Sequence, residues 1–159
     1  MERSYIVIIN ELSTKFQIFL FSNLIQKKGR KFNTKFVNKY GIAYECDFYP
    51  NLFVSDVKQI NFDDYADIFT GSLVYVVSSA LKSWFRDIYP ILVKEKKTII
   101  LVTGDSVVNA PLTALDININ KLQNLKEEGV IFHWFCQNCD VDFQDYVTPI
   151  PLGIDYHTL

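Results

Sequence analysis

The chain contains Ser72-Leu-Val-Tyr-Val-Val-Ser78, then Thr98-Ile-Ile-Leu-Val-Thr103, then Val130-Ile-Phe-His-Trp-Phe135. All three runs are apolar and rich in β-branched or aromatic residues, and each has the length of a buried strand. Stretches with helical spacing and short connections separate them, an order that predicts right-handed βαβ units. We therefore expect an α/β fold: a Rossmann-like parallel sheet with helices on both faces, in a single domain spanning residues 1–159.

The segments between these strands contain residues that typically begin or end helices. Ser79 stands where it could cap the helix after the first strand, and Pro90 should kink or divide that helix, because a proline in a helix interior removes one hydrogen bond. Thr113-x-x-Asp116 resembles a capping box, and Gly129 should end the second helix. Outward from this centre, Ser4 to Ile9 is a short run suited to a further buried strand.

Composition narrows the class of protein. The 159 residues suit one domain, and 49% apolar and 15% aromatic residues are typical of a folded chain with one sizeable core. A net charge of −2 and the lack of a long Lys/Arg block argue against nucleic acid as a partner. No apolar run is long enough to span a membrane, and no signal peptide is recognisable. Three cysteines, an odd number, favour a reducing compartment, so we expect a cytoplasmic protein.

Polar residues follow two of the predicted strands. Gly104-Asp-Ser106 comes directly after the second strand, where glycine would let a ligand approach the backbone while Asp105 and Ser106 offer an acceptor and a hydroxyl. An ordinary turn explains the same tripeptide. Gln137 and Asn138 come where the third strand should end. Ligands of open α/β sheets bind beyond the carboxyl ends of the strands, so these residues are candidate ligand contacts.

Three further groups of residues could form functional sites, but a structural role is the preferred interpretation for each. His133 lies inside a strand, where a hydrogen-bonded core histidine is the commoner role. Cys136-x-x-Cys139, with Cys46 and His133, has enough ligand types for zinc but lacks a second close pair, and its context is not that of a thioredoxin-like redox motif, so buried thiols are favoured. Asp140-Val-Asp142 has the spacing of a cation and diphosphate site, but a solvated loop is the preferred interpretation. We predict no resident cofactor and no metal site.

Three blocks taken together resemble the pattern of exostosin-like glycosyltransferases: Leu101-Val-Thr-Gly-Asp-Ser106, His133-Trp-Phe-Cys-Gln-Asn138 and Pro149-Ile-Pro-Leu-Gly-Ile-Asp-Tyr-His-Thr158. Their order and spacing are shared over about the last third of the chain. In that family similar strings lie in the acceptor-side half of a two-Rossmann, GT-B-like fold. The half that follows carries most contacts to the nucleotide-sugar donor. The resemblance thus implies that this chain is the N-terminal, acceptor-side domain of a longer enzyme and is inactive without its C-terminal half.

The resemblance also implies the site residues. Substrate would contact Gly104, Ser106, Gln137, Asn138, Gly153 and Asp155, and the catalytic base would be Asp105, with His157 as the second choice. Cys136 departs from the family pattern, which usually has a small residue such as alanine there. The partners implied are a nucleotide-sugar, a glycan acceptor and the C-terminal domain, with a divalent cation possible but not predicted.

Two other functions stay open. The chain could be a non-catalytic Rossmann-like module that binds a glycan or a protein, which would bind acceptor but not donor. It could also be a sirtuin-like NAD enzyme, suggested by Thr103-Gly-Asp-Ser106 and Gln137-Asn-Cys-Asp140, although the Gly-Ala-Gly element of such enzymes is missing. The abundance of Ile, Asn, Lys, Phe and Tyr is typical of an AT-rich coding genome, as in some giant viruses or protists.

Overall fold

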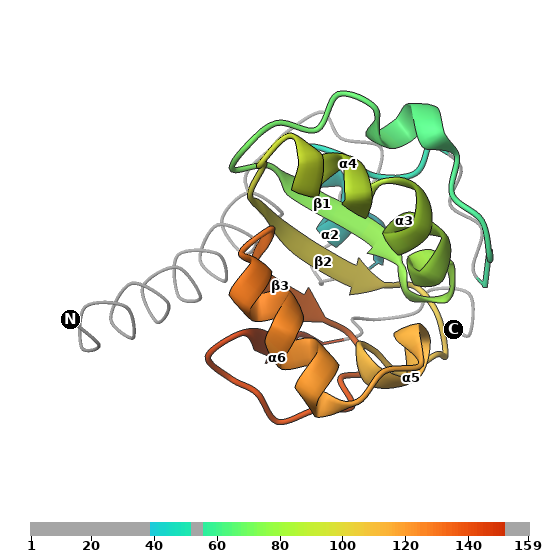
Figure 1. Cartoon of the computed structure of the whole chain (residues 1–159). Coiled ribbons are helices and arrows are strands. Elements are labelled where there is room, and N and C mark those ends of the chain that lie inside the picture. Colours follow the sequence, from blue (N-terminus) through green and yellow to red (C-terminus); the bar gives the residue numbers. More distant parts are fainter. Residues whose placement is uncertain (1–38, 52–55, 152–159) are drawn as a thin grey trace, which may run out of the picture. The chain divides into compact units, whose positions relative to one another are not determined.

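The computed structural model describes residues 39–51 and 56–151 (Figure 1). The expected strand at Ser4 to Ile9, and Gly153, Asp155 and His157, lie outside these residues. The chain divides into two compact units, residues 1–45 with 153–159, and residues 46–152. In the first unit the described element is α2, Lys39–Tyr44. The second unit carries the sheet and the helices that cover it.

Four parallel strands form the sheet in the order β1-β2-β3-β4. They are β1 (Leu73–Val77), β2 (Ile99–Gly104), β3 (Ile131–Cys136) and β4 (Val147–Pro149). Val77 pairs with Gly104 and Thr103 with Cys136, so β1, β2 and β3 end at nearly the same level of one edge. Phe48 adds a single parallel bridge to Val74 beside β1. The all-parallel sheet confirms the predicted α/β, Rossmann-like class.

Helices fill the connections between the strands. Between β1 and β2 lie η2 (Ser78–Ala80), α3 (Leu81–Asp87) and α4 (Tyr89–Lys94), and between β2 and β3 lie α5 (Leu112–Leu115) and α6 (Ile119–Glu128). A further short turn of helix, η1 (Phe62–Tyr65), precedes β1. Pro90 stands in the first turn of α4, where a missing N–H costs nothing, and this confirms that the proline divides the predicted helix.

Two predicted helix caps are wrong. Ser79 donates its hydroxyl to the carbonyl of Val57 at 2.7 Å and makes no side-chain cap at α3. The capping box at Thr113 is replaced by a break, because Asp116 adopts a left-handed φ of 58° that ends α5. A new helix, α6, starts after Asn118, whose side chain accepts from the Lys121 amide at 3.0 Å. Gly129 ends α6 at φ 70°, as predicted.

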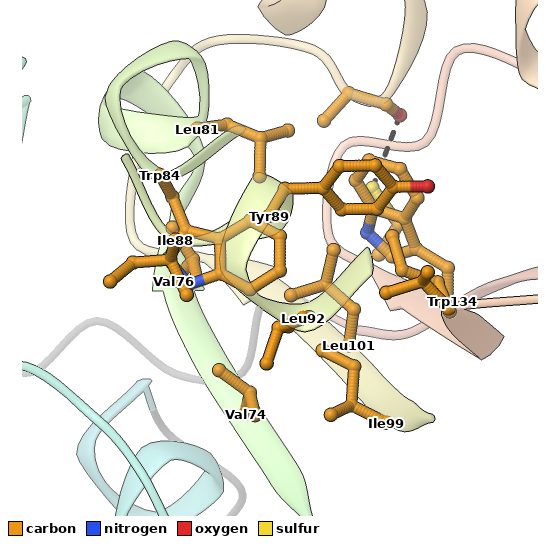
Figure 2. Close-up of a cluster of buried hydrophobic side chains, with 14 of the residues drawn as sticks. Val74, Val76, Leu81, Trp84, Ile88, Tyr89, Leu92, Ile99, Leu101 and Trp134 are labelled. Atoms are coloured by element: carbon orange, nitrogen blue, oxygen red, sulfur yellow. Dashed lines mark hydrogen bonds between the residues drawn. The ribbon is translucent and has the colours of Figure 1, made fainter. Parts of the chain in front are cut away.

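Both faces of the sheet are buried. Because the strand order follows the chain order, right-handed crossovers bring α3, α4 and α6 to one face (Figure 1). There, side chains of β1 and β2 pack with Leu81, Trp84 and Leu92 of the helices (Figure 2). On the opposite face Tyr75, Val102 and Phe135 are also buried. Burial on both faces is what all-parallel sheets require.

The described strands run in sequence order without a reversal. A reversal of strand order is what opens the usual ligand crevice in doubly wound sheets. The part of the sheet that the structure describes therefore places no such crevice between two strands, and the loops at its carboxyl edge are the place for a candidate site. Among the described helices, none has both the length and the apolar character needed to cross a bilayer.

Candidate functional site

The candidate site lies at the carboxyl edge of the sheet, where the segments after β2 and β3 meet. Both segments turn sharply, since Asp105 and Asn138 have left-handed φ values of 53° and 48°. Asp and Asn are the residues other than glycine that tolerate this conformation best. The sequence thus supplies suitable residues at both turns, and the turns bring four of the predicted site residues, Asp105, Ser106, Gln137 and Asn138, together.

Gln137 is the centre of this arrangement. Its backbone amide donates to the Thr103 carbonyl at 2.9 Å, and its side-chain Oε1 accepts from the Asp105 amide at 3.0 Å. Its Nε2 donates to the Pro151 carbonyl at 3.1 Å. Gln137 is 1% exposed, so these bonds are shielded from water. The residue therefore joins the end of β2 to the segment that follows β4.

Gly104 is required by close packing. A Cβ at this position would lie 2.1 Å from Gln137 Oε1 and 2.9 Å from the Tyr75 hydroxyl. These two side chains fill the space beside its Cα. The approach of a ligand to the Gly104 backbone stays a prediction. Tyr75, which the sequence analysis did not select, is thus part of the site. The only signal for it was a tyrosine inside an otherwise aliphatic strand.

Asp105 is the acidic group of the site and is 8% exposed. It lies near enough to Tyr75 to act on its ionisation: burial raises the pKa of the Tyr75 hydroxyl well above its usual value, and the Asp105 charge raises it further. Tyr75 consequently stays protonated at physiological pH. The hydrogen bond from the Asp105 amide to Gln137 fixes the backbone from which this side chain extends.

Ser106 and Asn138 connect the edge to a neighbouring loop. Asn138 Nδ2 donates to the Ser106 carbonyl at 2.9 Å, while the Ser106 hydroxyl donates to Asp56 Oδ1 at 2.8 Å and accepts from the Val108 amide at 3.1 Å. Asp56 was not selected from the sequence, since nothing local distinguishes it from other acidic loop residues. The contact fixes the start of the loop that leads to η1.

That loop borders a cavity of about 220 Å³. Val77 at the end of β1 and Ala80 of η2 line it, and Asn51, Gln59, Asn61 and Asp64 supply polar groups. Gln59 is itself held, because its Oε1 accepts from Ser83 Oγ at 3.1 Å and from Arg86 Nη2 at 3.0 Å. The volume is below the roughly 300–1,000 Å³ of sites for drug-sized ligands, and most of the lining surface is apolar.

Asp140 has a structural role. Its two carboxylate oxygens accept from the amides of Leu112 at 3.0 Å and Thr113 at 2.7 Å, so it caps α5 from across the chain. Capping satisfies amides that have no partner within the helix. The described residues contain no group of three or more His, Cys, Asp or Glu side chains that could hold a metal ion. Asp140 thus serves as a helix cap, a role that the preferred interpretation of Asp140-Val-Asp142 as a solvated loop did not predict.

His133 is a core residue, as the sequence favoured. It is 4% exposed, and its Nε2 lies 2.8 Å from Thr148 Oγ1. Burial lowers its pKa from 6.5 to about 4, and the nearby Asp145 charge opposes this only in part. The ring is therefore neutral at physiological pH. It packs against the Phe135 ring with centroids 4.9 Å apart.

Comparison of the chain with protein-family models, with curated proteins and with solved structures finds no match.

Proposed function

We propose that this α/β unit is the acceptor-side domain of an exostosin-like glycosyltransferase, which transfers a sugar from a nucleotide-sugar to an acceptor hydroxyl. The proposal rests on the resemblance of three sequence blocks to that family. One structural observation supports it: Gln137, in the second block, hydrogen-bonds to Thr103 and Asp105 in the first and to Pro151 in the third. Segments that share a function need to meet, and these segments do.

Asp105 is the proposed general base. Its carboxylate would take the proton of the acceptor hydroxyl while that oxygen attacks the anomeric carbon of the sugar. The bond from this carbon to the diphosphate oxygen breaks, and the diphosphate leaves with both electrons. His157 is the second choice for the base and lies outside the described residues.

The remaining residues would bind or position substrate. Ser106, Asn138 and the backbone at Gly104 lie at the same edge, and Gly153 and Asp155 complete the proposed set beyond the described residues. Gln137 would be a positioning residue, because its side-chain amide is hydrogen-bonded to the backbone of Asp105 and of Pro151. By the resemblance, a following domain would contribute the donor contacts, and the donor diphosphate would be stabilised there.

A glycan array followed by calorimetry tests the proposal on the full chain. An acceptor-side domain should bind one class of glycan and give no heat with UDP-sugars or GDP-sugars in the presence of Mn²⁺. Absence of any glycan binding would contradict the proposal. Heat with NAD instead would favour the sirtuin-like alternative, and heat with a nucleotide-sugar would move this unit to the donor side.

A non-catalytic glycan- or protein-binding module is the second candidate. One observation is compatible with it: Ser106, Gln137 and Asn138 already hydrogen-bond within the protein, so the edge is built as a rigid support. A rigid support suits recognition as well as catalysis.

Asp105→Asn separates these two functions. Asparagine tolerates the left-handed φ of 53° at this position, so the loop should keep its shape. If Asp105 is the base, the variant in the complete enzyme should lose transfer by about 10²–10⁴-fold while glycan binding stays nearly unchanged. Asp142→Asn, at an exposed loop residue, is the control with the same charge change. Full transfer by the Asp105 variant would exclude Asp105 as the base.

A further inference from the structure

A groove separates α3 from α6, two helices that cover the same face of the sheet (Figure 1). Its lining comes from these two helices and from the end of α5, and none of the residues of the carboxyl-edge site takes part in it. The groove has a volume of about 470 Å³. This volume lies within the range of roughly 300–1,000 Å³ that is typical of small-molecule sites, so the groove is a second place where a ligand could bind.

The floor of the groove is apolar and is held in place by the core. Four half-buried side chains line it and also pack against the hydrophobic core: Phe85, Leu115, Ile117 and Leu125. The Phe85 ring stacks on the rings of Tyr89 and Trp134, with centroids 4.8 Å and 6.0 Å apart. A ring that is already fixed by stacking loses little conformational freedom when a ligand binds to it. The floor is therefore a preformed apolar surface.

Charged side chains are divided between the two ends of the groove. Lys82 lies in the first turn of α3, and Lys121 lies in the first turn of α6. In βαβ units the helices run antiparallel to the strands, so both lysines lie toward the carboxyl edge of the sheet. Glu128, the last residue of α6, lies at the other end, where its Oε2 accepts from the Tyr89 hydroxyl at 2.5 Å. The groove thus has a cationic end and an anionic end.

The two lysines at the cationic end have no partner among the described residues. Neither Lys82 Nζ nor Lys121 Nζ forms a hydrogen bond or an ion pair there. Arg86, the third cation that lines the groove, differs from them, because its Nη2 donates to Asp87 Oδ2 at 2.7 Å and to Gln59 Oε1 at 3.0 Å. Two lysine amines beside an apolar surface are the chemical complement of an anion with an apolar body.

We propose that this groove binds a small amphipathic anion, an apolar ring or chain that carries one carboxylate at its end. The apolar body would lie on Phe85 and Leu125, and the carboxylate would accept hydrogen bonds from Lys82 and Lys121. Glu128 at the opposite end would repel a second anionic group, which selects for a single carboxylate. The inference rests on the groove alone and does not depend on the proposed glycosyltransferase function.

Titration of the full chain with naphthoate, an aromatic carboxylate, tests the inference by isothermal calorimetry. Naphthoate should bind saturably to a single class of site at micromolar to millimolar concentration, and added NaCl should weaken the binding. Naphthylmethanol, which has the same ring without a charge, should bind about tenfold more weakly or worse, because the hydrogen bonds to a charged group are lost. Naphthylmethylammonium, which is a cation, should show no saturable binding in the same range.

Charge reversal at the two lysines tests the cationic end. Glutamate is favourable in the first turn of a helix, so Lys82→Glu/Lys121→Glu should leave α3 and α6 intact. Its affinity for naphthoate should fall by about tenfold or more. Lys58→Glu/Lys94→Glu changes the net charge equally at two exposed lysines outside the groove, and it should bind naphthoate nearly as wild type does. Equal losses in the two double variants would overturn the inference.

A larger side chain at Asn124 tests the groove itself. Asn124 is exposed and lines the groove, so Asn124→Trp should fill part of it without a change in the core and should weaken naphthoate binding. Gln144→Trp, at an exposed loop residue outside the groove, is the control and should not. The inference is wrong if wild type shows no saturable naphthoate binding up to millimolar concentration. It is also wrong if only an acidic peptide rich in Leu and Glu binds there, which would make the groove a docking surface for a protein.

Discussion

At the scale of single residues, Gly104 shows how one atom shapes the candidate site. The residue sits at the end of β2, opposite Val77, and lies against the Gln137 amide and the Tyr75 hydroxyl. A hydrogen in place of a side chain is what allows Gln137 to reach the Asp105 amide. The glycine therefore leaves room for the Gln137 side chain, and Gln137 in turn holds the backbone of Asp105.

Gly104→Ala should destabilise the protein by about 1–3 kcal/mol, because a methyl group 2.1 Å from Gln137 Oε1 forces a buried side chain to move. Urea unfolding followed by circular dichroism measures the change. In Gly104→Ala/Gln137→Ala the methyl group meets no amide, so the loss should be smaller than the sum of the single changes. Additive losses would show that Gln137 is not the group that excludes a side chain at 104.

At the scale of elements, the short helix α5 depends on a residue far away in sequence. It has four residues, and none of its own side chains caps it. Asp140 provides this cap from the segment after β3, with hydrogen bonds to Leu112 and Thr113. The same segment follows the turn at Asn138, so the loop after β3 organises the connection between β2 and α6.

Asp140→Ala should cost about 0.5–2 kcal/mol, the range of a lost helix cap, since two amides of α5 would lose their acceptor. Thermal or urea unfolding measures the loss, and hydrogen exchange at Leu112 and Thr113 should accelerate locally. Asp142→Ala is the matched control and should change stability by less than about 0.5 kcal/mol, because Asp142 is exposed. Equal losses in the two variants would argue against the capping role.

At the scale of the whole unit, most side chains on both faces of the parallel sheet are buried, so the stability of the unit depends on the ionisation of the titratable groups among them. His133 is the clearest case, since its ring is 4% exposed and its pKa falls to about 4. In the unfolded chain the same ring titrates near 6.5. Folding therefore favours the neutral form. This contribution to stability is fully present above pH 6.5 and is lost as the pH falls through about 4.

The free energy of unfolding should thus decrease by up to about 3 kcal/mol between pH 6.5 and pH 4 because of His133, the value of a pKa shift of this size. Other groups also titrate in this range, so the measurement is the difference between wild type and His133→Gln in urea unfolding at each pH. The variant should lose less stability on acidification. Parallel pH profiles for the two proteins would show that His133 is not buried as a neutral ring.

Much of the architecture followed from local pattern. The apolar runs at 72–78, 98–103 and 130–135 became β1, β2 and β3 within one residue, and Pro90 divided the helix as predicted. Strand length, the apolar pattern of a strand and the missing amide hydrogen of proline can be predicted from sequence, because they depend only on residues close together in the chain. The predicted caps at Ser79 and Thr113 were wrong for two reasons. The Ser79 hydroxyl donates to the Val57 carbonyl instead of capping a helix, and the chain breaks at Asp116, which ends α5.

For the candidate site, the sequence predicted the location but not the contacts of its residues. Polar residues directly after strands pointed to the carboxyl edge, and Asp105, Ser106, Gln137 and Asn138 do come together there. Their roles depend on contacts with Tyr75, Asp56 and Pro151. These partners are distant along the chain, so hydrogen bonds and packing in the folded unit select them, and no local pattern carries that information.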